Sequence, residues 1–164
     1  MENQTHLHFM CGKAGAGKST LAHALAHRHQ AVLLSEDVWL ARLYPDELSS
    51  FDDYIRCARR IKQVVAPLVV DLLSRQSVVL DFPANTVESR RWFRALFEQA
   101  ACAHTLHHVH ASHALCLARI AQRNVERPEG SHEIDEATFM HITSFFEAPT
   151  PGEGLHVQLH AQDA

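Results

Sequence analysis

Residues 12–19 read Gly-Lys-Ala-Gly-Ala-Gly-Lys-Ser, which matches the pattern Gly-x-x-x-x-Gly-Lys-Ser/Thr. Such an octapeptide is typical of a loop that wraps the phosphates of a nucleoside triphosphate, because its glycines let the backbone turn and aim successive N–H groups at one anion. The residues at 7–11 predict a short strand before the loop, and Leu21, Ala22 and Leu25 recur at helical spacing after it. Strand, glycine loop and helix are therefore expected in the order that a phosphate site requires.

Each side chain of the loop has an expected role toward a nucleotide. Lys18 offers a point charge to the β- and γ-phosphates, and the Ser19 hydroxyl can ligate the Mg²⁺ that accompanies them. The helix that begins near Lys18 adds the positive end of its dipole. The residues predicted to contact the nucleotide here are Gly12, Lys13, Ala14, Gly15, Ala16, Gly17, Lys18, Ser19 and Thr20.

Length and composition limit the chain to one domain. It has 164 residues, of which 46% are hydrophobic, so we expect a single domain over residues 1–164 with flexible ends at residues 1–5 and 161–164. The net charge of −4 disfavours a protein that grips nucleic acid through a broad positive field. It favours a small-molecule partner, although a local basic groove is compatible with it.

Cysteine usage and hydropathy predict a water-soluble protein in a reducing compartment. The four cysteines form no Cys-x-x-Cys pair, which argues against a disulfide framework or a zinc knuckle. No stretch resembles a signal peptide or reaches the length of a membrane-spanning helix. We expect a cytoplasmic enzyme without a membrane partner, and the sequence leaves a monomer and a homodimer equally open.

Apolar runs alternate with helical periodicity along the chain. A helix over residues 51–74 contains Pro67, which predicts a kink or a break. The alternation implies a three-layer α/β/α domain around a five-stranded parallel sheet, with ligands at the carboxyl ends of the strands. The predicted strands span residues 7–11, 31–34, 77–81, 104–109 and 155–159, and the further helices span residues 87–100, 112–126 and 135–146.

Three carboxylates follow predicted strands and are candidates for chemistry at that edge. Asp37 is the preferred general base, because a carboxylate beside the glycine loop can orient and deprotonate an acceptor hydroxyl, and Glu36 competes for this role. Either could instead cap a helix that begins near Val38. Asp81 could hold magnesium or bind the acceptor, or it could be an ordinary strand-end turn residue. The candidate magnesium ligands are Ser19, Asp37 and Asp81.

Arg119, Arg123 and Arg127 recur every four residues. At this spacing they would share one helix face that leads into a loop rich in helix breakers. Arginines on a mobile lid can close over a triphosphate and neutralise the transferred group. Arg123 and Arg127 are therefore candidate catalytic residues beside Lys18 and Asp37, and Arg119 and Arg123 are candidate nucleotide contacts. A solvated helix face is the alternative.

Two further basic groups are open to more than one interpretation. Arg90 and Arg91 could reach substrate from the helix that follows Asp81, or with Arg94 they could be surface charges. A basic stretch of the long helix could bind an anionic acceptor such as a phosphorylated sugar, a nucleotide or a nucleic acid end, but a solvated face is the preferred interpretation. This stretch comprises Arg56, Arg59, Arg60 and Lys62.

Histidines crowd one predicted strand and the loop after it. Their spacing alone could suggest a metal site, but no carboxylates or cysteines accompany them at zinc-like separations. We interpret them as polar strand and loop positions. They are His104, His107, His108, His110 and His113.

The motifs together resemble the small P-loop kinases of the zeta-toxin, chloramphenicol phosphotransferase and polynucleotide kinase group, in its branch of bacterial AAA-type ATP-binding proteins. The resemblance rests on the glycine loop, Ser35-Glu36-Asp37, Val78-Val79-Leu80-Asp81-Phe82 and Arg119-x-x-x-Arg123-x-x-x-Arg127-Pro128.

This resemblance implies ATP and Mg²⁺ as cosubstrates and a kinase-type P-loop NTPase fold with strand order 2-3-1-4-5. It implies that Asp37 is the catalytic aspartate, that Arg123 and Arg127 belong to a lid, and that residues 149–154 border the nucleotide base. Leu40 stands where polynucleotide kinases carry an arginine, with Arg42 nearby, which weakens a nucleic acid end as the acceptor.

The favoured hypothesis is an ATP-dependent kinase that transfers the γ-phosphate to a hydroxyl group of a small molecule. The alternatives are a 5′-hydroxyl polynucleotide kinase and a nucleotide-binding regulatory ATPase without a phosphoryl acceptor. A GTPase is disfavoured, because the chain has no Asn-Lys-x-Asp motif and Asp81 is followed by Phe82-Pro83-Ala84 instead of a switch sequence.

Overall fold

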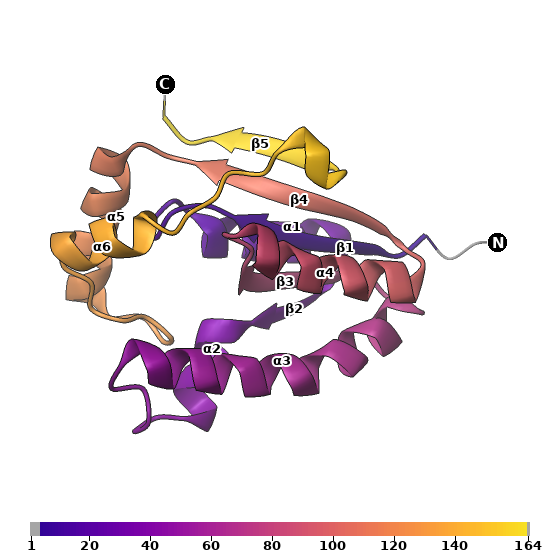
Figure 1. Ribbon diagram of the computed structural model, residues 1–164, viewed down its shortest axis with the longest axis horizontal. Coiled ribbons are helices and arrows are strands. Elements are labelled where there is room, and N and C mark those ends of the chain that lie inside the picture. The colour runs from indigo at the N-terminus through magenta and orange to yellow at the C-terminus, as the bar shows by residue number, and fades with distance from the viewer. Residues whose placement is uncertain (1–3, 164) are drawn as a thin grey trace.

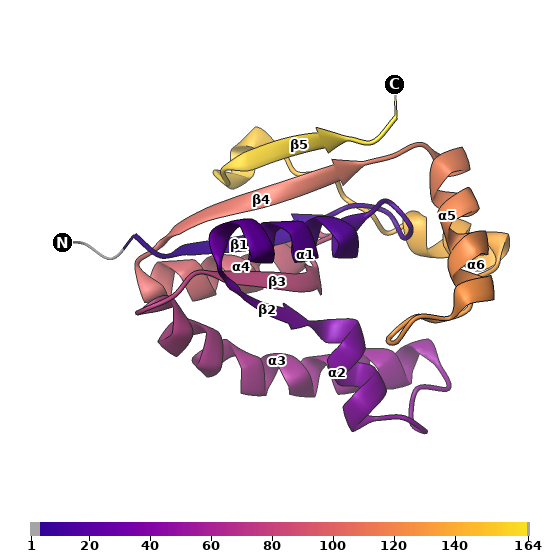
Figure 2. The same cartoon turned by 180° about the vertical axis from the view of Figure 1, so that it is seen from behind.

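The computed structural model describes residues 4–163, which form one five-stranded parallel sheet with helices on both faces (Figures 1 and 2). The order of the strands across the sheet is β2-β3-β1-β4-β5. This confirms the predicted three-layer architecture and strand order. The strands are β1 (His6–Cys11), β2 (Val32–Ser35), β3 (Val78–Pro83), β4 (Ala103–His110) and β5 (Val157–Ala161).

Alternation along β1 decides which helix layer each side chain meets. Met10 packs with Ala22 and Leu25, which belong to the helix on one face of the sheet. Phe9 points to the other face, where its ring centroid lies 4.6 Å from that of Phe93 in the larger core. Successive strand side chains point to opposite faces of the sheet, and both faces are covered by helices. β1 therefore needs apolar residues at both its odd and its even positions. The first layer is α1 (Lys18–His29), and the second comprises α3 (Phe51–Leu73) and α4 (Val87–Ala100).

Hydroxyl and carboxylate caps fix where several helices begin. The Ser89 N–H donates to Thr86 Oγ1 and the Thr86 N–H donates to Ser89 Oγ, both at 3.0 Å, so α4 starts in a reciprocal capping box. Ser112 and Asp135 each accept a hydrogen bond from a backbone N–H three residues later. These two caps open α5 (His113–Glu126) and α6 (Glu136–Thr143), which stand beyond the carboxyl ends of the strands (Figure 1).

Three predicted boundaries shift in the structure. The helix expected near residue 38 is α2 (Glu36–Leu43), so the two carboxylates after β2 lie in its first turn. The helix expected to reach residue 146 ends as α6 at residue 143. A short 3₁₀ turn, η1 (Pro151–Glu153), precedes β5 and delays the last strand by two residues.

Pro67 does not break α3. The helix runs through it without interruption, and Figure 1 shows the ribbon bending toward its C-terminal end. Proline removes one helical hydrogen bond, but Val65 and Val69 on either side of it are fully buried against the sheet. No helix within residues 4–163 is long and apolar enough to cross a membrane.

The ends of the described chain are held by specific contacts. Thr5 is buried, and its hydroxyl donates to the carbonyl oxygen of Leu73. Ala161 closes β5, and the Asp163 carboxylate accepts hydrogen bonds from the N–H and hydroxyl of Ser112. These contacts favour ordered positions for Thr5 and residues 161–163, where the sequence predicted flexible ends. Residues 1–3 and 164, on which the same prediction falls, lie outside the described residues.

Candidate active site

The glycine loop connects β1 to α1 and lies at the carboxyl edge of the sheet. Gly15 has a φ of +76°, and a Cβ there would lie 2.6 Å from the carbonyl oxygen of Cys116, so no other residue fits this position. The Gly12 N–H donates to Asn85 Oδ1 at 2.9 Å. The loop is thus fixed from the side of α5 and from the end of β3.

Lys18 is already placed inside the loop. Its Nζ donates to the carbonyl oxygens of Gly12 at 2.6 Å and of Lys13 at 2.8 Å. Burial lowers the pKa of Lys18, and the negative charges of Asp81 and Asp37 act in the opposite direction. The ammonium group therefore sits where the loop would enclose an anion, with two carboxylates to support its charge.

Ser19, in the first turn of α1, meets Asp81 near the carboxyl end of β3. The Ser19 hydroxyl donates to Asp81 Oδ2 at 2.7 Å. A hydroxyl and a carboxylate oxygen at this separation can enter the coordination shell of one Mg²⁺, which prefers oxygen ligands. The structure therefore brings together two of the three predicted magnesium ligands.

Asp37 lies in the first turn of α2, close to the same charges. Its side chain is exposed, yet crowding by the surrounding protein and the negative charge of Asp81 raise its pKa. His132, Lys18 and Arg123 lower the same pKa through their positive charges. A carboxylate with a raised pKa is a better proton acceptor than an ordinary one, which fits the predicted general base.

Glu36 is held in a different environment from its neighbour in the sequence. Its side chain is only 1% exposed, and its Oε1 accepts a hydrogen bond from the Tyr54 hydroxyl at 2.6 Å. Burial raises the pKa of Glu36. Its Oε2 atom is buried and has no hydrogen-bond partner in the described part of the chain. Glu36 thus anchors α2 to α3, and Asp37 is the carboxylate of the two that remains exposed.

The three spaced arginines divide between two places. The Arg119 guanidinium donates to the carbonyl oxygen of Ala16 at 2.8 Å, which places it against the glycine loop. Arg127 is the C-cap of α5 with a φ of +49°, so it leaves the helix face that the spacing predicted. Arg123 and Arg127 instead line a lid cavity of about 250 Å³. Its other lining residues are Asn124, Pro128, Ser131 and Glu133.

Arg123 carries an unused donor. Its Nε is buried and, among residues 4–163, has no hydrogen-bond partner. A buried guanidinium N–H without an acceptor is costly, and a phosphate oxygen would satisfy it. The donor set of Lys18, Arg119 and Arg123 therefore fits a polyphosphate, while Ser19 and Asp81 fit its magnesium ion.

Comparison with known proteins agrees with this geometry. The AAA domain family matches residues 7–149. The chain belongs to the AAA domain family. The P-loop kinase-type fold and the family expected from the motifs are both confirmed.

Three solved structures with the fold of this AAA domain cover nearly its whole length. The "putative kinase" from Chloroflexus aurantiacus J-10-fl superposes with a TM-score of 0.77 at 18% identity, covering 98% of this chain and 87% of that one. Kti12 from Chaetomium thermophilum, in complex with ADP-AlF3, has a TM-score of 0.70 at 18% identity, with coverages of 96% and 89%. The APS kinase CysC from Mycobacterium tuberculosis, in complex with AMPPNP and APS, has a TM-score of 0.65 at 16% identity, with coverages of 98% and 90%. At these identities the similarity shows the fold alone. No curated protein sequence matches the chain.

Arg90 has a structural place in this AAA domain, and the idea that it reaches substrate is wrong. It is 1% exposed, pairs with Glu153 at 2.7 Å and donates to the carbonyl oxygen of Ala84 at 2.9 Å. Arg94 also donates to the backbone of Glu153, whereas Arg91 is exposed. These contacts tie the loop before β5 to α4.

The resemblance places the loop at residues 149–154 beside the nucleotide base, and this stays a prediction. The residues after β5 lie beside the glycine loop, because a parallel strand carries its carboxyl end to the ligand edge. The Gln162 side chain lies 3.4 Å from where a Cβ of Gly17 would be. Asn85 and Gln162 are the polar neighbours of the loop that sequence reasoning missed. The only available signal was a polar residue one or two positions after a strand, at Gln162 and at Asn85.

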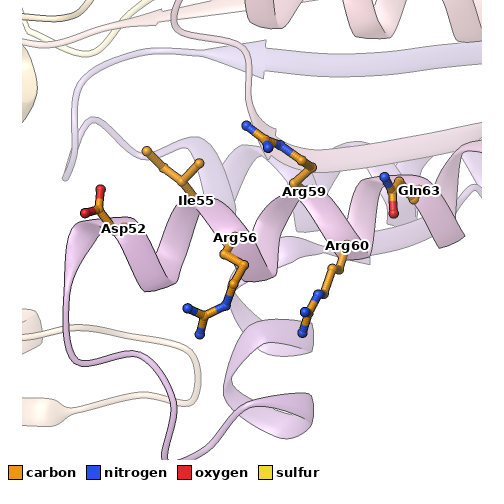
Figure 3. A pocket seen from close by; sticks show the side chains of 6 residues that line it. All are labelled: Asp52, Ile55, Arg56, Arg59, Arg60 and Gln63. Carbon is orange, nitrogen blue, oxygen red and sulfur yellow. The ribbon is translucent and has the colours of Figure 1, made fainter.

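The basic stretch of α3 is not joined to this site. Arg56, Arg59 and Arg60 border a surface depression of about 380 Å³ whose lining comes from α3 alone (Figure 3). Arg56 pairs with Asp53 at 3.0 Å, and Lys62 lies over the Trp92 ring at 5.4 Å. The other lining residues are Asp52, Ile55 and Gln63. The preferred interpretation of a solvated helix face agrees with these contacts.

The histidines on β4 lie in different environments, which the sequence did not distinguish. His104 stacks on Phe97 with ring centroids 3.8 Å apart, and His107 is 2% exposed and bonded to other histidines. His107 is therefore a polar strand position, as interpreted, but it is buried in the fold instead of exposed. Within the described residues, no group of three or more His, Cys, Asp or Glu side chains is arranged to hold a metal ion.

Proposed function

We propose that this AAA domain is an ATP-dependent phosphotransferase that moves the γ-phosphate to a hydroxyl group of a small molecule. The observation that carries the proposal is the Ser19–Asp81 hydrogen bond of 2.7 Å beside the half-buried Lys18. Asp37 and Arg123 lie within electrostatic reach of the same group. Phosphoryl transfer depends on positioned charges more than on covalent chemistry, and this cluster supplies them.

Each residue has a separate task in this proposal. Mg-ATP would supply the phosphoryl group and the divalent charge that neutralises it. The glycine loop and Lys18 would bind the phosphates, and Ser19 and Asp81 would hold the cation. Arg123 and Arg127 would donate to the phosphate oxygens from the lid, while Asp37 would accept the proton of the acceptor hydroxyl.

Transfer of label from γ-labelled ATP to a panel of metabolites, antibiotics and oligonucleotides tests the proposal. We expect a small-molecule product with the unmodified protein and a loss of about 10²- to 10⁴-fold in rate for Asp37→Asn, with ATP affinity retained. Asp46→Asn is the matched control, since Asp46 is an exposed carboxylate beyond the end of α2. A protein that binds ATP but labels no acceptor contradicts the proposal, and so does an Asp37→Asn variant that transfers at the normal rate.

Two other activities are separated by the same panel. The likeness to Kti12, whose structure holds ADP-AlF3, favours a nucleotide-hydrolysing protein without an acceptor as the second candidate. It would release free phosphate at a rate that Asp37→Asn leaves unchanged. A polynucleotide kinase would label 5′-hydroxyl oligonucleotides. We favour it less, because the basic residues of α3 border a depression that contains no residue of the glycine loop.

A further inference from the structure

An ion pair joins the lid to the helix that carries Asp37. Arg42 on α2 donates from Nε to Glu129 Oε1 at 2.6 Å and from Nη2 to Glu129 Oε2 at 3.0 Å. Two parallel hydrogen bonds of this kind fix the relative orientation of a guanidinium and a carboxylate. Glu129 belongs to the lid loop, which we define as residues 127–131 after α5. The lid loop is therefore fastened to an element 87 residues away in the sequence.

The next lid residue makes a backbone contact that only glycine permits. Gly130 has a φ of +81°, and a Cβ there would lie 3.0 Å from the carbonyl carbon of Asp37 and 3.1 Å from the Val38 nitrogen. Real Cβ atoms do not approach a backbone so closely without a shift of one partner, and a positive φ adds strain to any larger residue. The lid loop thus rests directly on the peptide unit that follows the proposed base.

This contact connects the two halves of the proposed site. Arg123 and Arg127 lie on the lid side, and Asp37 lies on the α2 side. Because Glu129 and Gly130 follow Arg127 directly in the chain, fastening them to α2 sets how the arginines stand relative to the base. The acceptor hydroxyl must lie between these groups during transfer.

We propose that Arg42, Glu129 and Gly130 form a latch that closes the lid loop on Asp37 and so positions the lid arginines against the acceptor. The positioning part of this proposal rests on the proposed function, whereas the latch itself does not. Arg42 and Glu129 are positioning residues, because they act through the lid and do not touch the reacting atoms. Their side chains are 67% and 54% exposed, so the ion pair alone shifts the closure equilibrium by about two- to fivefold. A contact of this strength can open and close in each turnover.

Amide hydrogen exchange of residues 127–132, measured by mass spectrometry without nucleotide, tests the latch. We expect Arg42→Ala and Glu129→Ala to speed exchange by about two- to fivefold. The reversed pair Arg42→Glu with Glu129→Arg should restore the slow rate. Arg75→Ala is the matched control, since Arg75, just beyond α3, forms an equally exposed pair with Asp71 of α3 at 2.7 Å. Exchange that stays at the wild-type rate in both single variants would overturn the latch.

A glycine substitution tests the backbone contact separately. Gly130→Ala should speed exchange of the lid loop more than Arg42→Ala does, because its Cβ opposes the closed position itself. Gly152→Ala is the control, since a Cβ at Gly152 would meet only the Thr150 hydroxyl at 4.0 Å. If the lid loop of Gly130→Ala exchanged at the wild-type rate, the proposed close contact between Gly130 and the backbone after Asp37 would be overturned.

Kinetics then test the positioning role. With an acceptor from the panel, Arg42→Ala should raise the acceptor KM or lower kcat by about two- to fivefold while the affinity for ATP changes less than twofold. The reversed pair should recover the wild-type values. If Arg42→Ala weakened ATP affinity as much as it changed the acceptor KM or kcat, the proposal that the latch positions the lid arginines against the acceptor would be overturned. Exchange requires no transfer activity, so the latch and the proposed function can fail independently.

Discussion

A chain of three imidazoles crosses the sheet beneath α1 and predicts that the protein loses stability in mild acid. His8 Nδ1 on β1 lies 2.9 Å from His107 Nε2 on β4, and His107 Nδ1 lies 2.9 Å from His160 Nε2 on β5. Only one proton fits into each of these N···N contacts. Two neighbouring rings therefore cannot both carry a second proton without breaking the chain.

The surroundings of this chain also favour neutral rings. Burial, together with the positive charges of the neighbouring His6, His107 and His29, lowers the pKa of His8 to about 3. Burial lowers the pKa of His107 to about 4, and charge on His160, His6 or His29 acts in the same direction. Burial lowers the pKa of His160, and the positive charge of Arg28 lowers it as well. Among residues 4–163, the groups that shift the pKa of His8, His107 and His160 are cationic or histidine side chains.

The size of the effect follows from proton linkage. In the unfolded chain each ring titrates near its ordinary pKa of about 6.5. At about pH 5, the unfolded chain binds a proton on each ring that the folded chain does not bind, which lowers the free energy of unfolding by about 2 kcal/mol per ring. His8 and His107 together give about 4 kcal/mol, or about 2 kcal/mol if the pair shares one proton. A domain of this size has about 5–15 kcal/mol in total, so the loss is large.

Urea unfolding at about pH 7.5 and at about pH 5 measures this loss directly. The double variant His8→Gln/His107→Gln should be less stable at neutral pH but should lose about 2–4 kcal/mol less than the wild type on acidification. The control is His23→Gln/His27→Gln, because both of these histidines are exposed on α1. Glu36 and Asp37 have raised pKa values and change stability in the opposite direction, so the comparison between variants is decisive. Equal losses in the double variant and the wild type would refute the reasoning.

Three further predictions concern the site and its support. Asp81→Asn should lower the pKa of Asp37, because it removes a negative charge that raises it, and an NMR titration of the Asp37 carboxyl carbon that shows no downward shift would contradict this. Arg123→Ala should slow transfer by about 10³-fold in single-turnover assays, since a lid arginine acts on the transferred phosphate, and a loss confined to ATP affinity would argue for ground-state binding instead. Glu153→Gln should destabilise the protein by about 3–5 kcal/mol in urea unfolding, because it leaves the buried Arg90 without its partner, and a change below about 1 kcal/mol would show that the pair is not important for stability.

Local patterns predicted most of the fold. The apolar runs at 7–11 and 77–81 matched β1 and β3 closely, because a strand covered on both faces has few polar positions. The helix over 87–100 was predicted to the residue, since its cap, amphipathic face and length are all local features. The helix over 51–74 was matched to within one residue, and the tertiary structure decided that Pro67 does not break it, because the flanking valines are buried.

Parts of the site could be predicted for the same reason. Lys18 and Ser19 belong to a contiguous motif, and Asp81 follows the apolar run 78–80 directly. Arg90 was misjudged, because a buried ion pair to Glu153 cannot be distinguished in the sequence from a surface charge. Arg127 was placed on a helix face by its spacing, but its left-handed backbone ends α5 there and turns the chain into the lid.

The sequence by itself determined the glycine loop, the class of fold and the strand order that goes with the family resemblance, since these depend on residues close together in the chain. Only the tertiary structure decided that Asp37 is exposed and that the adjacent Glu36 is buried, because the burial of Glu36 depends on Tyr54 of α3. It also decided the pairing of Arg42 with Glu129 and the alignment of three histidines. Such contacts depend on strand register and on helix placement, which join residues that no local pattern relates.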